Sequence, residues 1–183
     1  ARAGDTVTLV VSDMTRFWMR QDLVVPHLVD YLTERCGVLE EDITIVIANG
    51  THIGGDEQEL RTLVTDAVYD RVKVKNHDCE AKDLVYLGTT PHGTPVSIDR
   101  TVAEADLVVC LGAVTHHVMA GFGGGRKSIL PGISGRETIF HNHAFSLDAA
   151  QLRSNPAIGN GVLKGNPLHE DMCEAASLVN NLF

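Results

Sequence analysis

Three short runs of the chain are apolar without alternation and rich in β-branched residues. They are VTLVV at 7–11, ITIVIA at 43–48 and DLVVCLG at 106–112. Strands of a parallel sheet have this composition because helices cover both faces of the sheet. The three runs therefore predict buried strands of a mainly parallel sheet.

The segments between these runs carry apolar residues at helical spacing. In DLVVPHLVDYLTERCG, residues 22–37, Pro26 falls near the start, where a helix tolerates it, and Gly37 acts as a stop. Asp56 and Glu59 have the spacing of a capping box. The apolar residues after them fall at i, i+3, i+4 and i+7: Leu60, Leu63, Val64 and Ala67. We expect an amphipathic helix in each segment.

The second half of the chain adds further elements. RVKVKNHD at 71–78 alternates, and LVYLGTT and PVSID flank the turn-like TPHGT, which predicts a hairpin or a pair of edge strands. Ser134 and Glu137 repeat the capping-box spacing and predict a helix over ETIFHNHAF, and HEDMCEAASLV near the end is also helix-like. The predicted fold is α/β and Rossmann-like, a mainly parallel sheet flanked by helices with a small antiparallel addition.

Composition narrows the functional class. The 183 residues suit one domain, and a formal net charge of -9 opposes binding to nucleic acid. No apolar stretch approaches the roughly 20 residues that cross a bilayer, and the N-terminus lacks the features of a signal peptide, so we expect no membrane partner and a cytoplasmic location. The cysteines lack CxxC spacing and are expected to be reduced: Cys36, Cys79, Cys110 and Cys173.

Both ends of the chain look cut. The sequence opens almost directly on a strand, and it ends just after a helix-like segment with no following Gly or Pro. We therefore expect residues 1–183 to be one domain of a longer protein.

Reactive side chains follow each predicted buried strand. The first strand leads into Ser12-Asp13-Met14-Thr15-Arg16, the second into Asn49-Gly50-Thr51-His52, and the third into Thr115-His116-His117. Ligands of open α/β sheets bind outside the carboxyl ends of the strands. An acid, an arginine and several histidines are thus expected at one rim, although each alone could be a helix cap or a solvated residue.

The stretch AGFGGGRKSILPG, residues 120–132, nearly matches a phosphate-binding loop. Gly121 and Lys127-Ser128 fit the pattern GxxxxGK[ST], but Arg126 stands where the last glycine is required. This departure argues against a nucleotide triphosphatase. Consecutive glycines can still turn several N–H groups toward a single phosphate. The alternative without a ligand is a flexible surface loop.

The remaining histidines are weaker candidates. His141 and His143 lie two apart on a predicted helix and point roughly 200° apart, so at most one faces a cleft. The usual spacings of a protein-only zinc site are missing. Four other histidines are interpreted as structural or solvated: His27, His77, His92 and His169.

The order DxTR, GTH, HHxxAGFGGGRKSILPG and NH resembles the nickel-pincer-nucleotide lactate racemase family over essentially the whole chain. The resemblance implies a pyridinium-3,5-bisthiocarboxylic acid mononucleotide, attached through a thioamide to a lysine and holding nickel. It places that lysine at Lys127 and the nickel ligand at His143. One helix histidine suffices if the cofactor supplies the other ligands.

The resemblance also implies the other site residues. His52 and His117 become the acid/base pair, and Arg16 binds the substrate carboxylate. Asp13 and Thr15 lie near the cofactor, and the loop glycines accommodate its phosphate: Gly123, Gly124 and Gly125.

The implied reaction is racemisation of a 2-hydroxy acid through hydride transfer to the cofactor and back. One histidine takes the hydroxyl proton, and an ordinary pKa of about 6.5 suits both histidines to this work. Family members commonly have Pro-His where this chain has His116-His117, and Arg where it has Ile53. These departures border the substrate, which is expected to be a small chiral 2-hydroxy acid or a sugar acid.

The length of the family members leads to a further expectation about domain organisation. Members are about twice as long, with a C-terminal domain that closes the cleft, so residues 1–183 are expected to be the cofactor-binding N-terminal domain and weak or inactive alone. Cofactor-synthesis proteins are further expected partners. The alternatives are a non-catalytic nucleotide- or nickel-binding module and a dehydrogenase with a free dinucleotide, against which the lack of GxGxxG after the first strand argues.

Overall fold

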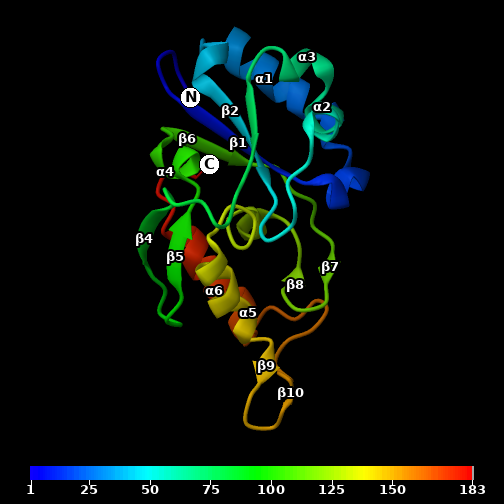
Figure 1. Ribbon diagram of the computed structural model, residues 1–183, viewed down its shortest axis with the longest axis vertical. Helices are drawn as coiled ribbons and strands as arrows, with labels where there is room; N and C mark the ends of the chain where they lie inside the picture. The colour runs from blue at the N-terminus through cyan, green and yellow to red at the C-terminus, as the bar shows by residue number, and fades with distance from the viewer. Residues whose placement is uncertain (183) are drawn as a thin grey trace.

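A four-stranded parallel sheet forms the centre of the computed structural model, which describes residues 1–182 (Figure 1). Phe183, the last residue of the expected domain, lies outside the described residues. The strand order is β3-β2-β1-β6, and all three pairings are parallel. The bounds are β1 Val7–Ser12, β2 Ile43–Ala48, β3 Lys73–Asn76 and β6 Leu107–Cys110. The predicted parallel sheet is confirmed.

Two apolar layers cover the sheet, as the unbroken apolar runs predict. On β1, Leu9 and Val11 pack with the core residues of α1 Val25–Glu34, α2 Glu57–Val64 and α3 Asp66–Tyr69. Val10 faces the opposite layer, which contains apolar residues of α4 Arg100–Glu104, α5 Arg136–Ala144 and α6 Pro167–Ser177. Successive strand residues point to opposite faces, so each layer takes alternate side chains.

The antiparallel addition is separate from the main sheet. β4 Val85–Thr89 and β5 Pro95–Ile98 form a two-stranded hairpin beside α6 (Figure 1). Two further pairs are short: β7 His116–His117 with β8 Gly121–Phe122, and β9 Leu147–Asp148 with β10 Arg153–Ser154. Residues 71–78 supply β3, an edge strand of the parallel sheet.

The two predicted capping boxes have different outcomes. Asp56 caps α2, since its side chain accepts a hydrogen bond from the Glu59 N–H, as expected. The expected cap at Ser134 is wrong: α5 begins at Arg136 with Gly135 as its N-cap. The Ser134 hydroxyl instead donates to the Ile129 carbonyl at 2.8 Å. The spacing rule finds the helix but not the competing carbonyl, which lies five residues earlier in the chain.

No helix among residues 1–182 is long and apolar enough to cross a membrane.

Candidate active site

A cavity of about 500 Å³ lies at the carboxyl ends of β1, β2 and β6. It is lined by nine of the ten residues expected there: Asp13, Thr15, Arg16, His52, His117, Gly123, Gly124, Lys127 and His143. Gly125 is exposed and does not line it. The parallel sheet therefore brings the segments that follow β1, β2 and β6 to one rim, as the strand-end rule predicts, and the helix α5 adds His143.

The segment after β1 holds Arg16 in place. Asp13 caps the 3₁₀ helix Met14–Met19, with Oδ1 accepting from the Thr15 N–H at 3.1 Å and from the Thr15 hydroxyl. Nη1 of Arg16 donates to Oγ1 of Thr15 at 3.0 Å. Arg16 is exposed and forms no ion pair with the described residues, so its guanidinium can receive an anion.

His52 follows β2 and faces Asp13. Its Nδ1 lies 2.5 Å from Oδ2 of Asp13. An ionised carboxylate only accepts hydrogen bonds, so Nδ1 carries the hydrogen and Nε2 keeps its lone pair. His52 is therefore arranged to accept a proton at Nε2.

Asn76, at the end of β3, fixes the loop that carries His52. Its amide donates to the Gly55 carbonyl at 2.7 Å and accepts from the Gly55 N–H at 3.1 Å, and its Oδ1 also accepts from Asn49 at 3.0 Å. A side chain on Gly54 would lie 2.8 Å from Cγ of Asn76, so the loop closes only with glycine there. Sequence reasoning missed this role; the only signal was a polar residue at the end of a strand.

His117 and Lys127 contact each other across the cavity. Nε2 of His117 lies 2.9 Å from Nζ of Lys127. Nδ1 of His117 accepts from the backbone N–H groups of Met119 at 3.2 Å and Ala120 at 3.1 Å. The turn 117–120 thus orients the ring.

Burial and clustered positive charge change both ionisations. Burial, followed by the charges of Lys127 and Arg16, lowers the pKa of His117 to about 4. Burial, followed by Arg16 and Arg126, lowers the pKa of Lys127 to about 8. The ordinary pKa expected for His117 is therefore wrong for this open cleft, because a buried imidazole beside cations resists a further charge.

The glycine loop packs closely on the backbone of Ala113, which precedes it in the chain. Side chains on Gly123 and Gly124 would lie 3.0 and 3.1 Å from the Ala113 carbonyl oxygen, and Gly124 has φ of 75°. Arg126, which breaks the triphosphatase pattern, donates from Nη2 to the Ala120 carbonyl at 2.7 Å. The Arg126 side chain thus stabilises the backbone of the loop and does not occupy a phosphate-binding position.

Only one histidine of the HNH stretch reaches the cavity, as the helical period predicts. His143 is half-buried and lines the cavity, whereas His141 is exposed and does not. Nδ1 of His143 donates to the Ile139 carbonyl at 3.0 Å, which leaves the Nε2 lone pair available. Burial lowers the pKa of His143, so the ring is neutral, as a metal ligand must be.

The donor set fits a metal group that brings most of its own ligands. His52 and His117 use Nδ1 for protein contacts, and His117 also uses Nε2. Asp13 is the one carboxylate among the described lining residues, and both its oxygens are engaged. No cysteine is among those lining residues. Nε2 of His143 and Nε2 of His52 have no hydrogen-bond partner among the described residues, and Lys127 is the one lysine of the lining.

A model of the lactate racemase N-terminal domain matches residues 1–154. The chain belongs to the lactate racemase family. Over its whole length it is 33% identical to a lactate racemase of Thermoanaerobacterium thermosaccharolyticum and 31% identical to one of Lactiplantibacillus plantarum. It spans only 41% and 42% of those two proteins.

Two solved structures share the fold of this chain. The apoprotein of lactate racemase from T. thermosaccharolyticum superposes with a TM-score of 0.87 at 33% identity, covering 98% of this chain and 42% of that one. A Thermotoga maritima protein superposes with a TM-score of 0.74 at 24% identity, covering 98% of this chain and 44% of that one. The second likeness shows the fold alone.

Residues 155–182 follow the part matched by the lactate racemase model and support the site. Asn166 is fully buried and caps α6 by accepting from the His169 N–H. Its amide also donates to the Met119 carbonyl at 2.8 Å, in the turn that orients His117. The start of α6 is thereby fastened to the candidate active site.

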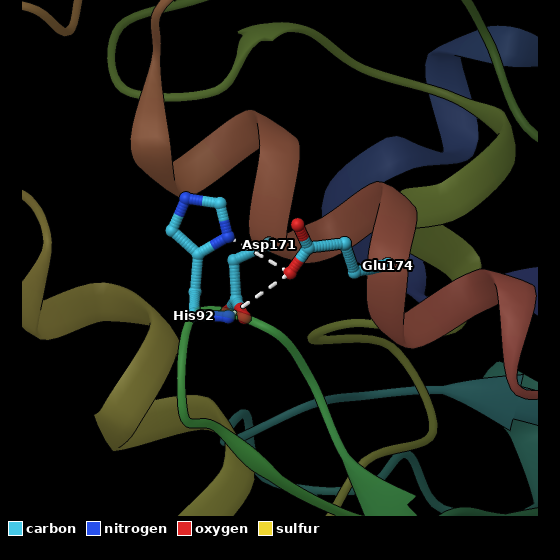
Figure 2. A group of neighbouring side chains, drawn as sticks. All are labelled: His92, Asp171 and Glu174. Carbon is cyan, nitrogen blue, oxygen red and sulfur yellow. Dashed lines mark hydrogen bonds and ion pairs between the residues drawn. The ribbon is translucent and has the colours of Figure 1, made fainter.

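Figure 2 shows a second group of polar side chains, His92, Asp171 and Glu174, none of which lines the cavity. His92, on the turn between β4 and β5, pairs through Nδ1 with Glu174 Oε2 of α6 at 2.8 Å. This hydrogen bond raises the pKa of His92. Asp171 lies beside the pair, and one ligand atom from each of the three residues falls within 4.8 Å of the others.

Internal hydrogen bonds already engage Asp171. Its fully buried carboxylate accepts from the hydroxyls of Thr90 and Thr94 and, at 2.8 Å, from the Asn142 amide. Asn142 lies on α5 beside His143, so Asp171 joins the hairpin and α6 to the helix that carries the free histidine. We interpret this group as a structural link between the hairpin, α6 and α5; His92 was expected to be structural or solvated.

Proposed function

We propose that this chain is the cofactor-bearing N-terminal domain of a longer two-domain enzyme that racemises or epimerises a 2-hydroxy acid. The observation that carries the proposal is that His52 and His117, from two different strand ends, line one cavity with Arg16. Inversion of a carbinol centre needs a proton acceptor and a proton donor near the hydroxyl, and a cation for the carboxylate. The lactate racemase relatives support the same reaction class.

Three side chains have separate roles in the proposed reaction. Arg16, steadied by Thr15, binds the substrate carboxylate. His52 takes the hydroxyl proton at Nε2, because Asp13 holds the hydrogen on Nδ1 and stabilises the imidazolium that results. His117 serves the opposite face once Lys127 no longer occupies its Nε2.

The nickel-pincer nucleotide is the cofactor that these residues suit. Lys127 would hold it covalently, His143 would ligate nickel through Nε2, and Asp13, Thr15, Gly123 and Gly124 would border the nucleotide. When bound, the group supplies the hydride acceptor and donor that the protein side chains lack. Imidazole is a suitable ligand for nickel, and the neutral ring of His143 would supply one such ligand while His52 is kept for proton transfer.

The substrate proposal is a lactate-like 2-hydroxy acid. His116 and Thr51 also line the cavity, so further polar side chains are available to a bound hydroxy acid. The C-terminal domain would complete the cleft, and cofactor-synthesis proteins would supply the nucleotide.

Isotope tracing in the full-length protein tests the proposal. The enzyme, loaded with the nickel cofactor, is assayed against a panel of chiral 2-hydroxy acids deuterated at Cα. Hydride chemistry keeps the deuterium in the product of opposite configuration, whereas loss of deuterium to solvent overturns the mechanism. Tight nickel binding with no turnover of any acid would instead support a non-catalytic nickel- or nucleotide-binding module.

A further inference from the structure

The hydrogens around His117 determine which nitrogen of its ring is protonated. Two backbone N–H groups, of Met119 and Ala120, point at Nδ1. A hydrogen on Nδ1 would face both donors, so Nδ1 must carry the lone pair. A neutral imidazole has one N–H, and it is therefore on Nε2.

This tautomer determines the state of Lys127. The Nε2–H of His117 is a donor, and Nζ of Lys127 lies 2.9 Å away. An ammonium group has three donors and no lone pair, so it cannot accept this hydrogen bond. Only the uncharged amine completes the contact as the structure shows it.

The surroundings of Lys127 favour the same state. Arg16 and Arg126 face it with positive charge, and the neutral rings of His117 and His143 line the same cavity. Asp13, the carboxylate among the described lining residues, is already engaged by Thr15 and His52. With its pKa lowered to about 8, Lys127 is uncharged in about a tenth of molecules at pH 7, against about one in 3,000 for an ordinary lysine.

We propose that His117 acts on Lys127 before it acts on the substrate. Its hydrogen bond holds the lysine as a free amine that can attack an acyl carbon entering the cleft. His117 is then a positioning residue for a covalent modification of the protein and later an acid/base group in turnover. The two histidines are inequivalent in the unmodified domain: His52 presents a lone pair to the cavity, and His117 presents a hydrogen.

The inference rests on the proposed function only for the identity of the natural acyl group. Thioamide formation with a thiocarboxylic acid forms a C–N bond to Nζ and breaks the C–O bond of the same carbon. The oxygen leaves as water with one hydrogen from the amine and one from the acid, and no oxidant or reductant is needed. The linked nitrogen is no longer basic, so it releases Nε2 of His117.

The test uses p-nitrophenyl acetate, a small neutral acyl donor, on this chain without nickel or nucleotide. Its ester C–O bond breaks, p-nitrophenolate leaves, and the amine loses a proton to water. Peptide mass spectrometry gives the acetylation rate of each lysine between pH 6 and 10. We expect the rate at Lys127 to be half-maximal near pH 8, while exposed Lys164 continues to gain reactivity toward pH 10.

His117→Phe keeps the ring but removes its hydrogen bond to the free amine. A hydrogen bond to the neutral form is worth about 1 kcal/mol, so the half-maximal pH of Lys127 should rise by roughly half to one unit. Acetylation of Lys127 at pH 7 should fall about five-fold, with Lys164 unchanged as the internal reference. A midpoint that stays or falls in the variant overturns the proposal.

A second measurement needs no variant. In the unaltered chain with ¹⁵N-labelled histidine at pH 9, Nδ1 of His117 should resonate as an unprotonated nitrogen and Nε2 as a protonated one. The opposite assignment overturns the proposal. Neither result depends on racemase activity, so failure of the isotope test in the full-length protein would leave this inference standing, and the reverse also holds.

Discussion

Asp13 and His52 come from the ends of neighbouring parallel strands, and Oδ2 of Asp13 lies 2.5 Å from Nδ1 of His52. The other carboxylate oxygen is engaged by Thr15, which also supports the Arg16 guanidinium. One carboxylate thus fixes the tautomer of the proposed base and the position of the proposed substrate anchor. Loss of its charge should affect the reaction more than the fold.

Asp13→Asn tests this coupling in the loaded full-length protein. The amide keeps the shape of the carboxylate but can turn a donor toward His52, which favours the wrong tautomer. We expect kcat to fall about 100- to 10,000-fold with a small change in KM, by analogy with other carboxylate–histidine pairs. Steady-state kinetics on the 2-hydroxy acid found active in the panel gives both constants.

Asp56→Asn is the matched control for this substitution. Asp56 also caps a helix through an oxygen, but it is exposed and does not line the cavity. It should leave kcat within about two-fold, because an amide oxygen caps as well as a carboxylate. Equal kinetic losses in the two variants would contradict a special role for Asp13.

The fold was largely predictable because burial on both faces leaves a clear sequence pattern. The run 43–48 is β2 without a change of boundary, and the first and third runs contain most of β1 and all of β6. The cavity rim was predictable for the same reason, since parallel strands end at one edge. The place of the β4–β5 hairpin was not, because its attachment to α6 depends on Asp171 and two threonines distant in sequence.

The positions of the ring protons of the two histidines could not be predicted from the sequence. His52 and His117 look alike as residues, and the difference between them arises from Asp13 on one side and two backbone N–H groups on the other. The helical period correctly separated His141 from His143, because that distinction depends only on local geometry. Hydrogen bonds to backbone atoms depend on how turns pack, and no spacing rule records them.

His143→Ala tests the proposed nickel ligand. Nickel content of the loaded full-length protein, measured by elemental analysis after gel filtration, should fall at least about ten-fold, since a site with one protein donor has no replacement. His141→Ala is the control, because that side chain is exposed and does not line the cavity. Equal retention of nickel in the two variants would disprove the assignment.

Gly132→Ala tests the close packing beneath the cavity. A side chain there would meet the Ser128 carbonyl group, with its carbon at 2.8 Å, and Cβ of Ala48 at 2.9 Å. The Gly132 carbonyl also accepts from the Gly50 N–H at 2.9 Å, in the loop that carries His52. We expect a loss of about 2 to 4 kcal/mol in the free energy of unfolding by urea.

Gly159→Ala provides the comparison for this variant. The added methyl group would meet only Val162 Cγ2 at 3.4 Å, and Gly159 does not have a positive φ. Its free energy of unfolding should change by less than about 0.5 kcal/mol. A similar loss in both variants would mean that steric contact with Ser128 is not the cause.

The stability of the domain should fall in acid partly because of Asp99. Burial alone would raise the pKa of this carboxyl, but hydrogen bonds from His77 and Lys75 outweigh burial and hold the pKa well below its usual range. The unfolded chain, with an ordinary pKa of 3.8, then binds the proton more readily. The contribution is complete above about pH 5 and is lost as the pH falls through about 4 and below.

Urea unfolding of the wild type and of Asp99→Asn between pH 3 and 7 measures the contribution of the Asp99 charge to stability. The difference in unfolding free energy should be on the order of 2 kcal/mol at neutral pH and should shrink toward pH 3. A difference that stays constant over this range would contradict the ionic role of Asp99.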